Sequence, residues 1–186
     1  FGVWSYKLES GVSGVVAVAR VPVGSPSQIV LIDPGGAVLR EYWTPSHITA
    51  VTIADLNNDK LNDILVAAEN DDLRDQLGVK SNTPLFTLFM LDPRTMKGEA
   101  PPYRGGRGAG VQLWYGAVCP AGVKVESLTT KDVDGDGLPD LWARLSDKRD
   151  LFINAKGKVV PVSQDIALAK PTFRLYGSNG LDGKCE

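Results

Sequence analysis

The chain has 186 residues, of which 43% are hydrophobic and 23% are charged, and it contains 20 Gly and 12 Pro. The length is that of one domain, and the composition is globular with many turns, which excludes disordered and collagen-like chains. Lys and Arg total 20 against 22 Asp and Glu, a net charge of −2, so no basic field is present to hold a nucleic acid. The apolar runs are far shorter than the ~20 residues of a membrane-spanning helix, so we expect no membrane span.

The chain begins Phe1-Gly2-Val3-Trp4, with neither an initiator Met nor a signal region. We therefore expect a processed or trimmed product. Segments 1–8 and 172–176 are candidates to add or complete strands at the two ends of the fold.

Three hairpin signatures follow one another along the chain. In each, an apolar strand runs into a turn and a second strand, over 28–39, 86–97 and 150–160. The polar residues at equivalent positions of the three turns are Asp33, Asp92 and Asn154.

Alternation of apolar and polar residues and β-branching predict most of the remaining secondary structure as strand. The strands are expected at 48–53, 64–68, 85–91, 124–129, 141–145, 151–153 and 158–162. The best helical candidate is the charged stretch 70–77, which is only about two turns long. The sequence therefore predicts an all-β fold.

The chain's one histidine, His47, precedes a predicted strand. A His-based catalytic triad would have to use it, but no Gly-x-Ser-x-Gly motif and no Ser or Cys context designates a nucleophile. We interpret His47 as a turn or packing residue and assign no catalytic residue.

Two acidic segments, 54–66 and 131–143, align without a gap at an offset of 77 residues. Oxygen side chains occupy positions 1, 3, 5 and 9 of each loop, and the backbone carbonyl at position 7 is a further candidate ligand. Hard oxygen donors at this spacing suit Ca²⁺. The candidate calcium ligands are Asp55, Asn57, Asp59, Leu61 and Asp63 in the first loop, and Asp132, Asp134, Asp136, Leu138 and Asp140 in the second.

These loops are not EF-hands. An EF-hand needs a bidentate Glu at position 12, where this chain has Val66 and Ala143. Strand-like residues follow each loop, so each loop is expected to join two strands. The alternative is that the Asp and Asn side chains only form tight solvated turns, which Asx residues favour.

Both loops resemble the FG-GAP or VCBS repeats of integrin-α-type β-propellers, whose pattern is Asp-x-Asx-x-Asp-Gly-x-x-Asp followed by a short hydrophobic strand. The second loop fits at every position, whereas the first has Lys60 in place of Gly. Gly there supplies a backbone conformation that is costly for other residues, so we expect the first site to be weaker or altered. The resemblance implies that each loop joins the first two strands of a blade and holds Ca²⁺.

After insertions of 15 and 18 residues are removed from the middle unit, the repeat period is 44 residues, as for four-stranded propeller blades. We expect a single domain with a partial blade at 13–45, a blade at 46–105, an inserted loop at 106–121, a blade at 122–163 and a tail at 164–186. About three units cannot close a propeller of four to eight blades. The chain is therefore expected to be a fragment, to close with another chain, or to form an open array.

The inserted stretch holds other candidates. Gly105 to Gly110 is glycine-rich but does not lie between a strand and a helix of a βαβ unit, so it is read as a loop rather than a phosphate site. Arg104 and Arg107, with Trp114 and Tyr115, are expected to form either a ligand-binding lip or a loop folded over a blade edge.

The roles of the tryptophans and of the two cysteines stay open. Trp43 and Trp114 could stack on a sugar if exposed, whereas Trp142 is expected in the core. Cys119 and Cys185 are either a disulfide, which would indicate an oxidising compartment, or two unrelated thiols.

The leading hypothesis is a calcium-binding, non-catalytic interaction or adhesion module, secreted or periplasmic, that binds protein or carbohydrate through its loops. One alternative is the scaffold of a polysaccharide-active enzyme. Its only candidate catalytic residues would be Arg104 or Arg107 with Tyr103 or Tyr115. The other is a structural subunit that completes a partner's propeller. Fold alone does not decide among them.

Overall fold

The computed structural model describes residues 2–20, 26–69, 83–96, 112–161, 172–177 and 180–181. These residues form thirteen strands and no helix. All strand pairs are antiparallel, and they make a four-stranded, a six-stranded and a three-stranded sheet. The expectation of an all-β fold is therefore confirmed for the described residues. Within these ranges, no helix is long and apolar enough to cross a membrane.

The first sheet is a meander in which each strand pairs with the next, in the order β1-β2-β3-β4. Its strands are β1 (Gly2–Lys7), β2 (Ser13–Arg20), β3 (Ser27–Ile32) and β4 (Val38–Thr44). The sheet begins at Gly2, so the first unit is a complete four-stranded sheet rather than a partial one that starts at residue 13. The predicted hairpin at 28–39 lies within β3 and the start of β4.

The second sheet has the order β13-β12-β8-β7-β6-β5. Its first four strands along the chain again form a meander, and two strands from the end of the chain extend the edge at β8. The strands are β5 (His47–Ala54), β6 (Asp63–Glu69), β7 (Phe86–Leu91), β8 (Gln112–Cys119), β12 (Thr172–Gly177) and β13 (Gly180–Leu181).

The third sheet has the order β11-β10-β9. Its strands are β9 (Val125–Lys131), β10 (Asp140–Leu145) and β11 (Asp150–Ile153). A single bridge from Ile153 to Val159 extends the hairpin beyond β11, where a full strand at 158–162 was predicted.

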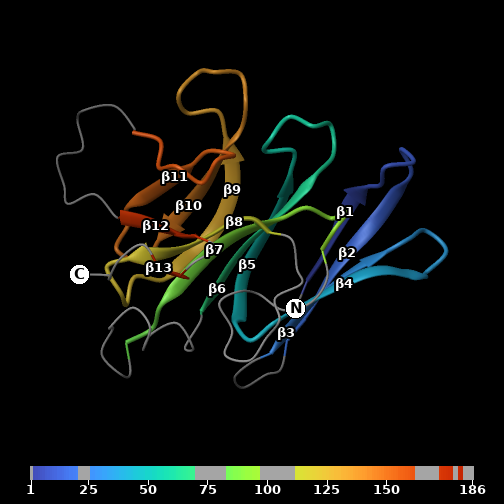
Figure 1. Ribbon diagram of the computed structural model, residues 1–186, viewed down its shortest axis with the longest axis horizontal. Coiled ribbons are helices and arrows are strands. Elements are labelled where there is room, and N and C mark those ends of the chain that lie inside the picture. Colours follow the sequence, from blue (N-terminus) through green and yellow to red (C-terminus); the bar gives the residue numbers. More distant parts are fainter. Residues whose placement is uncertain are drawn as a thin grey trace.

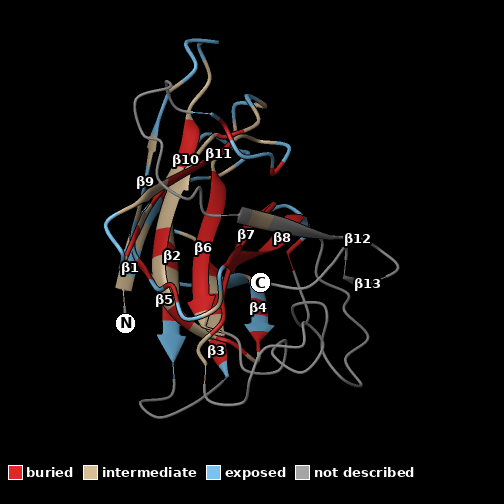
Figure 2. Ribbon diagram, turned by 90° about the vertical axis from the view of Figure 1, so that its left-hand side faces the viewer, coloured by how far each residue is buried: buried red, intermediate tan, exposed pale blue. Residues whose placement is uncertain are grey.

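The three sheets stack face to face, with the second sheet in the middle (Figure 1). Because side chains alternate between the two faces of a strand, β6 sends Ile64, Val66 and Ala68 to one core and Leu65 and Ala67 to the other. All five are fully buried, and Figure 2 shows β6 buried along most of its length. A strand covered on both faces therefore reads as an unbroken apolar run.

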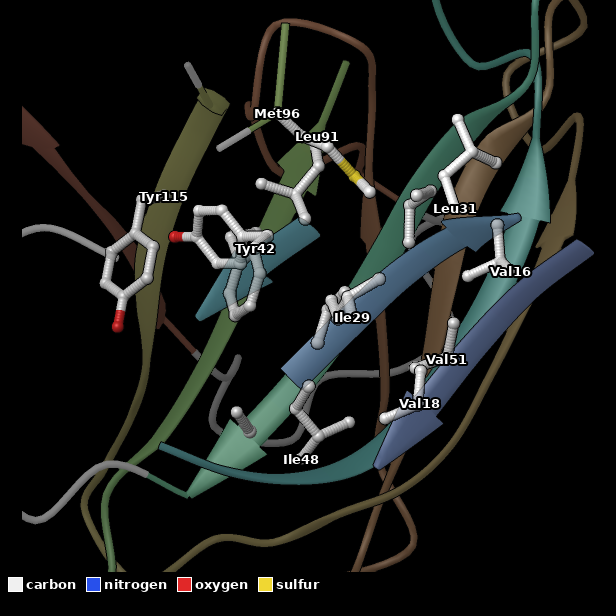
Figure 3. Close-up of a cluster of buried hydrophobic side chains, with 14 of the residues drawn as sticks. Val16, Val18, Ile29, Leu31, Tyr42, Ile48, Val51, Leu91, Met96 and Tyr115 are labelled. Carbon is white, nitrogen blue, oxygen red and sulfur yellow. The ribbon is translucent and has the colours of Figure 1, made fainter. Parts of the chain in front are cut away.

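One core lies between the first and second sheets (Figure 3). Ile29 and Tyr42 of the first sheet meet Phe89 and Tyr115 of the second. The Phe89 ring lies 6.0 Å from Tyr42 and 5.4 Å from Tyr115, centroid to centroid. The other core lies between the second and third sheets, where Leu65 and Leu88 pack with Leu141. Burial of this kind stabilises by roughly 25 cal/mol per Å² of apolar surface.

The structure differs from the sequence-based expectations at β8, and it does not confirm two of the others. Residues 112–119, within the stretch expected to be an inserted loop, form β8, which pairs with β7 on one side and β12 on the other. The helical candidate at 70–77 lies outside the described residues. None of the three sheets closes into a ring in the described part of the chain, so the structure gives stacked sheets and does not establish a propeller.

Candidate metal-binding loops

The two acidic loops have equivalent places in the fold. The first loop, residues 55–63, joins β5 to β6, and the second loop, residues 132–140, joins β9 to β10. Each therefore connects two adjacent antiparallel strands, as expected from the strand-like residues that follow it. Both loops lie at the upper end of the stack in Figure 1.

The last aspartate of each loop is buried and closes it. Asp63 and Asp140 are each 2% exposed. One carboxylate oxygen of Asp63 accepts the Leu56 amide at 3.1 Å, and Asp140 accepts the Val133 amide at the same distance. Position 9 is thus tied to position 2 in both loops, because a buried carboxylate needs hydrogen-bond donors.

Carboxylates of the second loop accept hydrogen bonds from its own backbone. Asp132 accepts the amides of Gly135 at 2.8 Å and Gly137 at 3.0 Å. Asp134 accepts the Asp136 amide at 3.2 Å, and Asp136 accepts the Leu138 amide at 2.8 Å. These bonds turn the backbone tightly and direct the side chains at positions 1, 3 and 5 inward.

The first loop has nearly the same pattern. Asp55 accepts the amides of Asp59 at 3.1 Å and Lys60 at 2.8 Å. Asn57 also accepts the Asp59 amide, at 3.0 Å, and Asp59 accepts the Leu61 amide at 2.9 Å. The two patterns differ in one donor: Asp55 accepts the amide of position 5, whereas Asp132 accepts the amide of position 4. The sequence alignment of the loops therefore corresponds to a shared backbone conformation.

Positions 4 and 6 of both loops have a positive φ. The values are 78° and 86° at Gly135 and Gly137, and 60° and 70° at Asn58 and Lys60. Asn tolerates this left-handed region better than most residues, whereas for Lys it costs roughly 1 kcal/mol. The strain expected at Lys60 is therefore present, and the equivalent demand on Asn58 had not been predicted.

Three aspartates of the second loop form a candidate cation site. One carboxylate oxygen from each of Asp132, Asp134 and Asp136 lies within 4.8 Å of the other two, and all three residues are exposed. Asp140 lies outside this group and is buried. Burial raises the pKa of Asp140 against the hydrogen bond from Val133, and the three nearby carboxylates raise it further. The negative charge at this loop is thus concentrated, and the oxygen donors fit a hard divalent cation.

The first loop has an ion pair where the second has this cluster. Arg94, in the turn after β7, places one terminal nitrogen 2.8 Å from Asp59 and 2.7 Å from Asp92. Burial opposes ionisation of Asp92, but the hydrogen bonds and charge of Arg94 outweigh it and lower the pKa of Asp92. The hydrogen bond to Asp92 also raises the pKa of Arg94, against desolvation. Both partners therefore remain charged.

Asp63, the buried carboxyl of the first loop, has a perturbed pKa. Burial raises its pKa to about 7; the Leu56 amide opposes this shift, and the charges of Asp59, Asp55 and Asp92 add to it. The ionised form of Asp63 is thus disfavoured by its surroundings.

The predicted carbonyl ligands at position 7 are Leu61 and Leu138. Their amides donate within the loops, as described above, and both residues are half-buried. Coordination by their carbonyl oxygens stays a prediction.

Several other sequence candidates are placed by the structure. Trp114 and Tyr115 are 5% and 4% exposed, so they belong to the cores and do not form a ligand-binding lip. Trp43 is 40% exposed. Trp142, expected in the core, faces away from it and donates its indole N–H to Asp150 at 2.9 Å.

His47 lies at the start of β5, with its Nε2 3.1 Å from a terminal nitrogen of Arg20. Cys119, in β8, is disulfide-bonded, whereas Cys185 lies outside the described residues. The glycine-rich stretch 105–110 and the residues Tyr103, Arg104 and Arg107 also lie outside the described residues.

A cavity of about 380 Å³ lies between turns of the first and second sheets. Arg40 and Arg94 line it together with Glu9, Asp33 and the buried Tyr6. Burial raises the pKa of Tyr6 to about 12, with further contributions from Asp92 and Glu9. Charges of both signs line this cavity, so it selects no single ligand charge.

The residue that sequence reasoning missed is Arg94. The hairpin equivalence of Asp92 and Asn154 puts Arg94 in register with Lys156, and a basic residue two positions after the polar residue of each turn was the available signal. No family model matches this chain, and no curated protein matches it either.

Proposed function

We propose that this protein is a calcium-stabilised, non-catalytic interaction module of the FG-GAP or VCBS type, secreted or periplasmic, that binds protein or carbohydrate through its loops. The observation that carries the proposal is the cluster of Asp132, Asp134 and Asp136. Ca²⁺ is the ion proposed for it.

The chemistry of the cluster supports calcium. Three exposed carboxylates whose oxygens lie within 4.8 Å repel one another. A divalent cation would convert that repulsion into attraction, and Ca²⁺ accepts oxygen ligands in flexible geometry. Asp132, Asp134 and Asp136 would hold the ion, with the Leu138 carbonyl and Asp140 as further candidates. The ion would fix the connection between β9 and β10.

The arrangement of the sheets supports the repeat assignment. The first two sheets each contain four sequential antiparallel strands, and the third has three strands and a bridge. In the second and third sheets an acidic loop joins the first strand to the second. This is the place that the FG-GAP resemblance implies for a calcium loop. The proposal of propeller-type blades rests on this agreement.

The disulfide at Cys119 supports a secreted or periplasmic location. Disulfides persist in oxidising compartments and are rare where thiol reductants act. We therefore include a secreted or periplasmic location in the proposal.

A structural subunit that completes a partner's propeller is the second candidate. The outer face of the first sheet exposes large apolar side chains: Val3 is 70%, Val38 61% and Trp43 40% exposed. An apolar surface of this kind favours contact with a further sheet. The enzyme scaffold has less support, because Tyr115, one of its candidate catalytic residues, is buried in a core.

Thermal unfolding of the metal-stripped protein, titrated with Ca²⁺ and with Mg²⁺ as a control, tests the proposal. A ligand that binds only the folded state at about 100 times its Kd adds about 2.7 kcal/mol, which for a chain of this size raises Tm by roughly 5–10 °C. The rise should be selective for Ca²⁺ and should disappear in Asp134→Ala and Asp136→Ala. Glu126→Gln, an exposed carboxylate on the same sheet, is the matched control and should keep it. No shift in a folded, metal-free sample would contradict the proposal.

A further inference from the structure

We propose that the guanidinium of Arg94 takes the place of a bound cation in the first loop, so that this loop keeps its conformation without metal. The inference rests on the proposed function only for the contrast with the second loop. Arg94 would be the residue that decides which of two similar loops depends on calcium.

The ion pairs fix the Arg94 side chain from both sides. Its Nε lies 2.9 Å and 3.1 Å from the two carboxylate oxygens of Asp92, and a terminal nitrogen reaches both Asp92 and Asp59. The backbone carbonyl of Arg94 accepts the Arg40 Nε–H at 2.7 Å. A planar guanidinium held in this way is a preorganised cation with directed donors.

Asp59 is the residue through which Arg94 acts on the loop. One oxygen of Asp59 accepts the Leu61 amide, and the other accepts the Arg94 guanidinium. Both oxygens of Asp55 are likewise used, by the amides of Asp59 and Lys60. All four carboxylate oxygens at positions 1 and 5 are therefore satisfied from within the chain.

The charge at positions 1, 3 and 5 differs between the loops. The first loop has two carboxylates and the neutral Asn57, and Arg94 adds one positive charge. The second loop has three carboxylates, and in the described part of the chain none of them is ion-paired with a basic side chain. With Asp92, which shares the Arg94 guanidinium, the formal charge around the first loop is −2, against −3 with no paired cation at the second loop, so the second loop retains the stronger demand for an external cation.

Lys156 provides the matched comparison. Its amide donates to Asn154 at 3.0 Å, as the Arg94 amide donates to Asp92 at 2.9 Å. The two turns therefore have the same local hydrogen bond, yet the Lys156 side chain is exposed and makes no ion pair with the second loop. Asn154, unlike Asp92, has no charge to hold a basic side chain in place.

Amide hydrogen exchange in EDTA, read by mass spectrometry on peptides covering 55–63 and 132–140, tests the inference. Arg94→Gln should speed exchange of 55–63 by about threefold, the size expected for a partly exposed ion pair. Lys156→Gln, the matched control, should leave 132–140 unchanged. Added Ca²⁺ should leave exchange of 55–63 in the wild type unchanged.

A second variant covers the case in which Arg94→Gln loosens the whole fold, which faster exchange in 141–145 would reveal. Asp59→Asn removes the loop carboxylate that pairs with Arg94 but leaves the Arg94–Asp92 pair, and it should speed exchange of 55–63 alone. The inference is wrong if neither variant speeds exchange of 55–63, or if Ca²⁺ slows that exchange in the wild type. A failure of Ca²⁺ to slow exchange of 132–140 would instead contradict the proposed calcium site.

Discussion

The first and second acidic loops have similar backbones but balance their charge in different ways. Both turn through two residues of positive φ, and both are closed by a buried aspartate. The first loop is half-buried against the turn after β7, whose Arg94 pairs with Asp59. The second loop projects three exposed carboxylates. We infer that the loop conformation, which depends on backbone hydrogen bonds, is separable from the proposed metal requirement, which depends on unbalanced charge.

The largest expected difference between the loops is in their response to pH. Asp63 has an unfolded-state pKa of 3.8 and a folded-state pKa of about 7, so the folded protein binds the proton more tightly. Stability is then greatest below pH 4 as far as this group is concerned, and it falls as pH rises to about 7. The loss should be on the order of 2–4 kcal/mol.

Urea unfolding of the wild type and Asp63→Asn in EDTA at pH 5 and pH 8 measures this loss. The asparagine keeps an acceptor for the Leu56 amide but cannot ionise, so the variant should gain stability over the wild type as pH rises. Asp140→Asn is the matched variant in the second loop. An equal pH response of wild type and Asp63→Asn would contradict the assignment of the titration to Asp63.

An exchange of residues at position 6 should have an intermediate effect. Gly137→Lys introduces the strain of the first loop into the second and should cost about 1 kcal/mol, because no atom lies within 4 Å of the added Cβ and the cost is confined to the backbone. Lys60→Gly should relieve the same strain, although greater freedom of the unfolded chain offsets part of the gain. The denaturation midpoints of the two variants should therefore move in opposite directions, and shifts of the same sign would show that the two backbones are not equivalent.

The smallest expected effect is that of salt. At 1 M ionic strength the screening length is about 3 Å, so the partly exposed Arg94–Asp59 pair should weaken, whereas repulsion among the carboxylates of the second loop should be relieved. In EDTA, amide exchange of 55–63 should become slightly faster with added NaCl and that of 132–140 slightly slower. A change of exchange rate in the same direction for both loops would contradict the inference that their charges are balanced differently.

Much of this comparison could be predicted from the sequence. The spacing of Asp132, Asp134 and Asp136 predicted the carboxylate cluster, and the departure at Lys60 predicted strain at position 6. Both features are local, because alternate side chains on a tight turn converge regardless of the rest of the fold. The hairpins were predictable for the same reason, since each joins strands that are adjacent along the chain.

The remainder depends on contacts between distant segments. Arg94 reaches Asp59 only because β7 pairs with β6, which follows the first loop. The sequence did not predict β8, because its residues face two different cores and show no alternation of apolar and polar residues. In the sequence, Trp114 and Tyr115 therefore resemble aromatic residues of a binding loop. The pairing of β12 with β8 likewise joins segments that are far apart in the sequence, and no periodic pattern reports it.

Calorimetric titration of the metal-stripped protein with Ca²⁺ tests the central claim most directly. The account predicts one site per chain, lost in Asp134→Ala and Asp136→Ala and retained in Asp59→Ala. Two equivalent sites, no site, or a site lost in Asp59→Ala but kept in Asp134→Ala would contradict it.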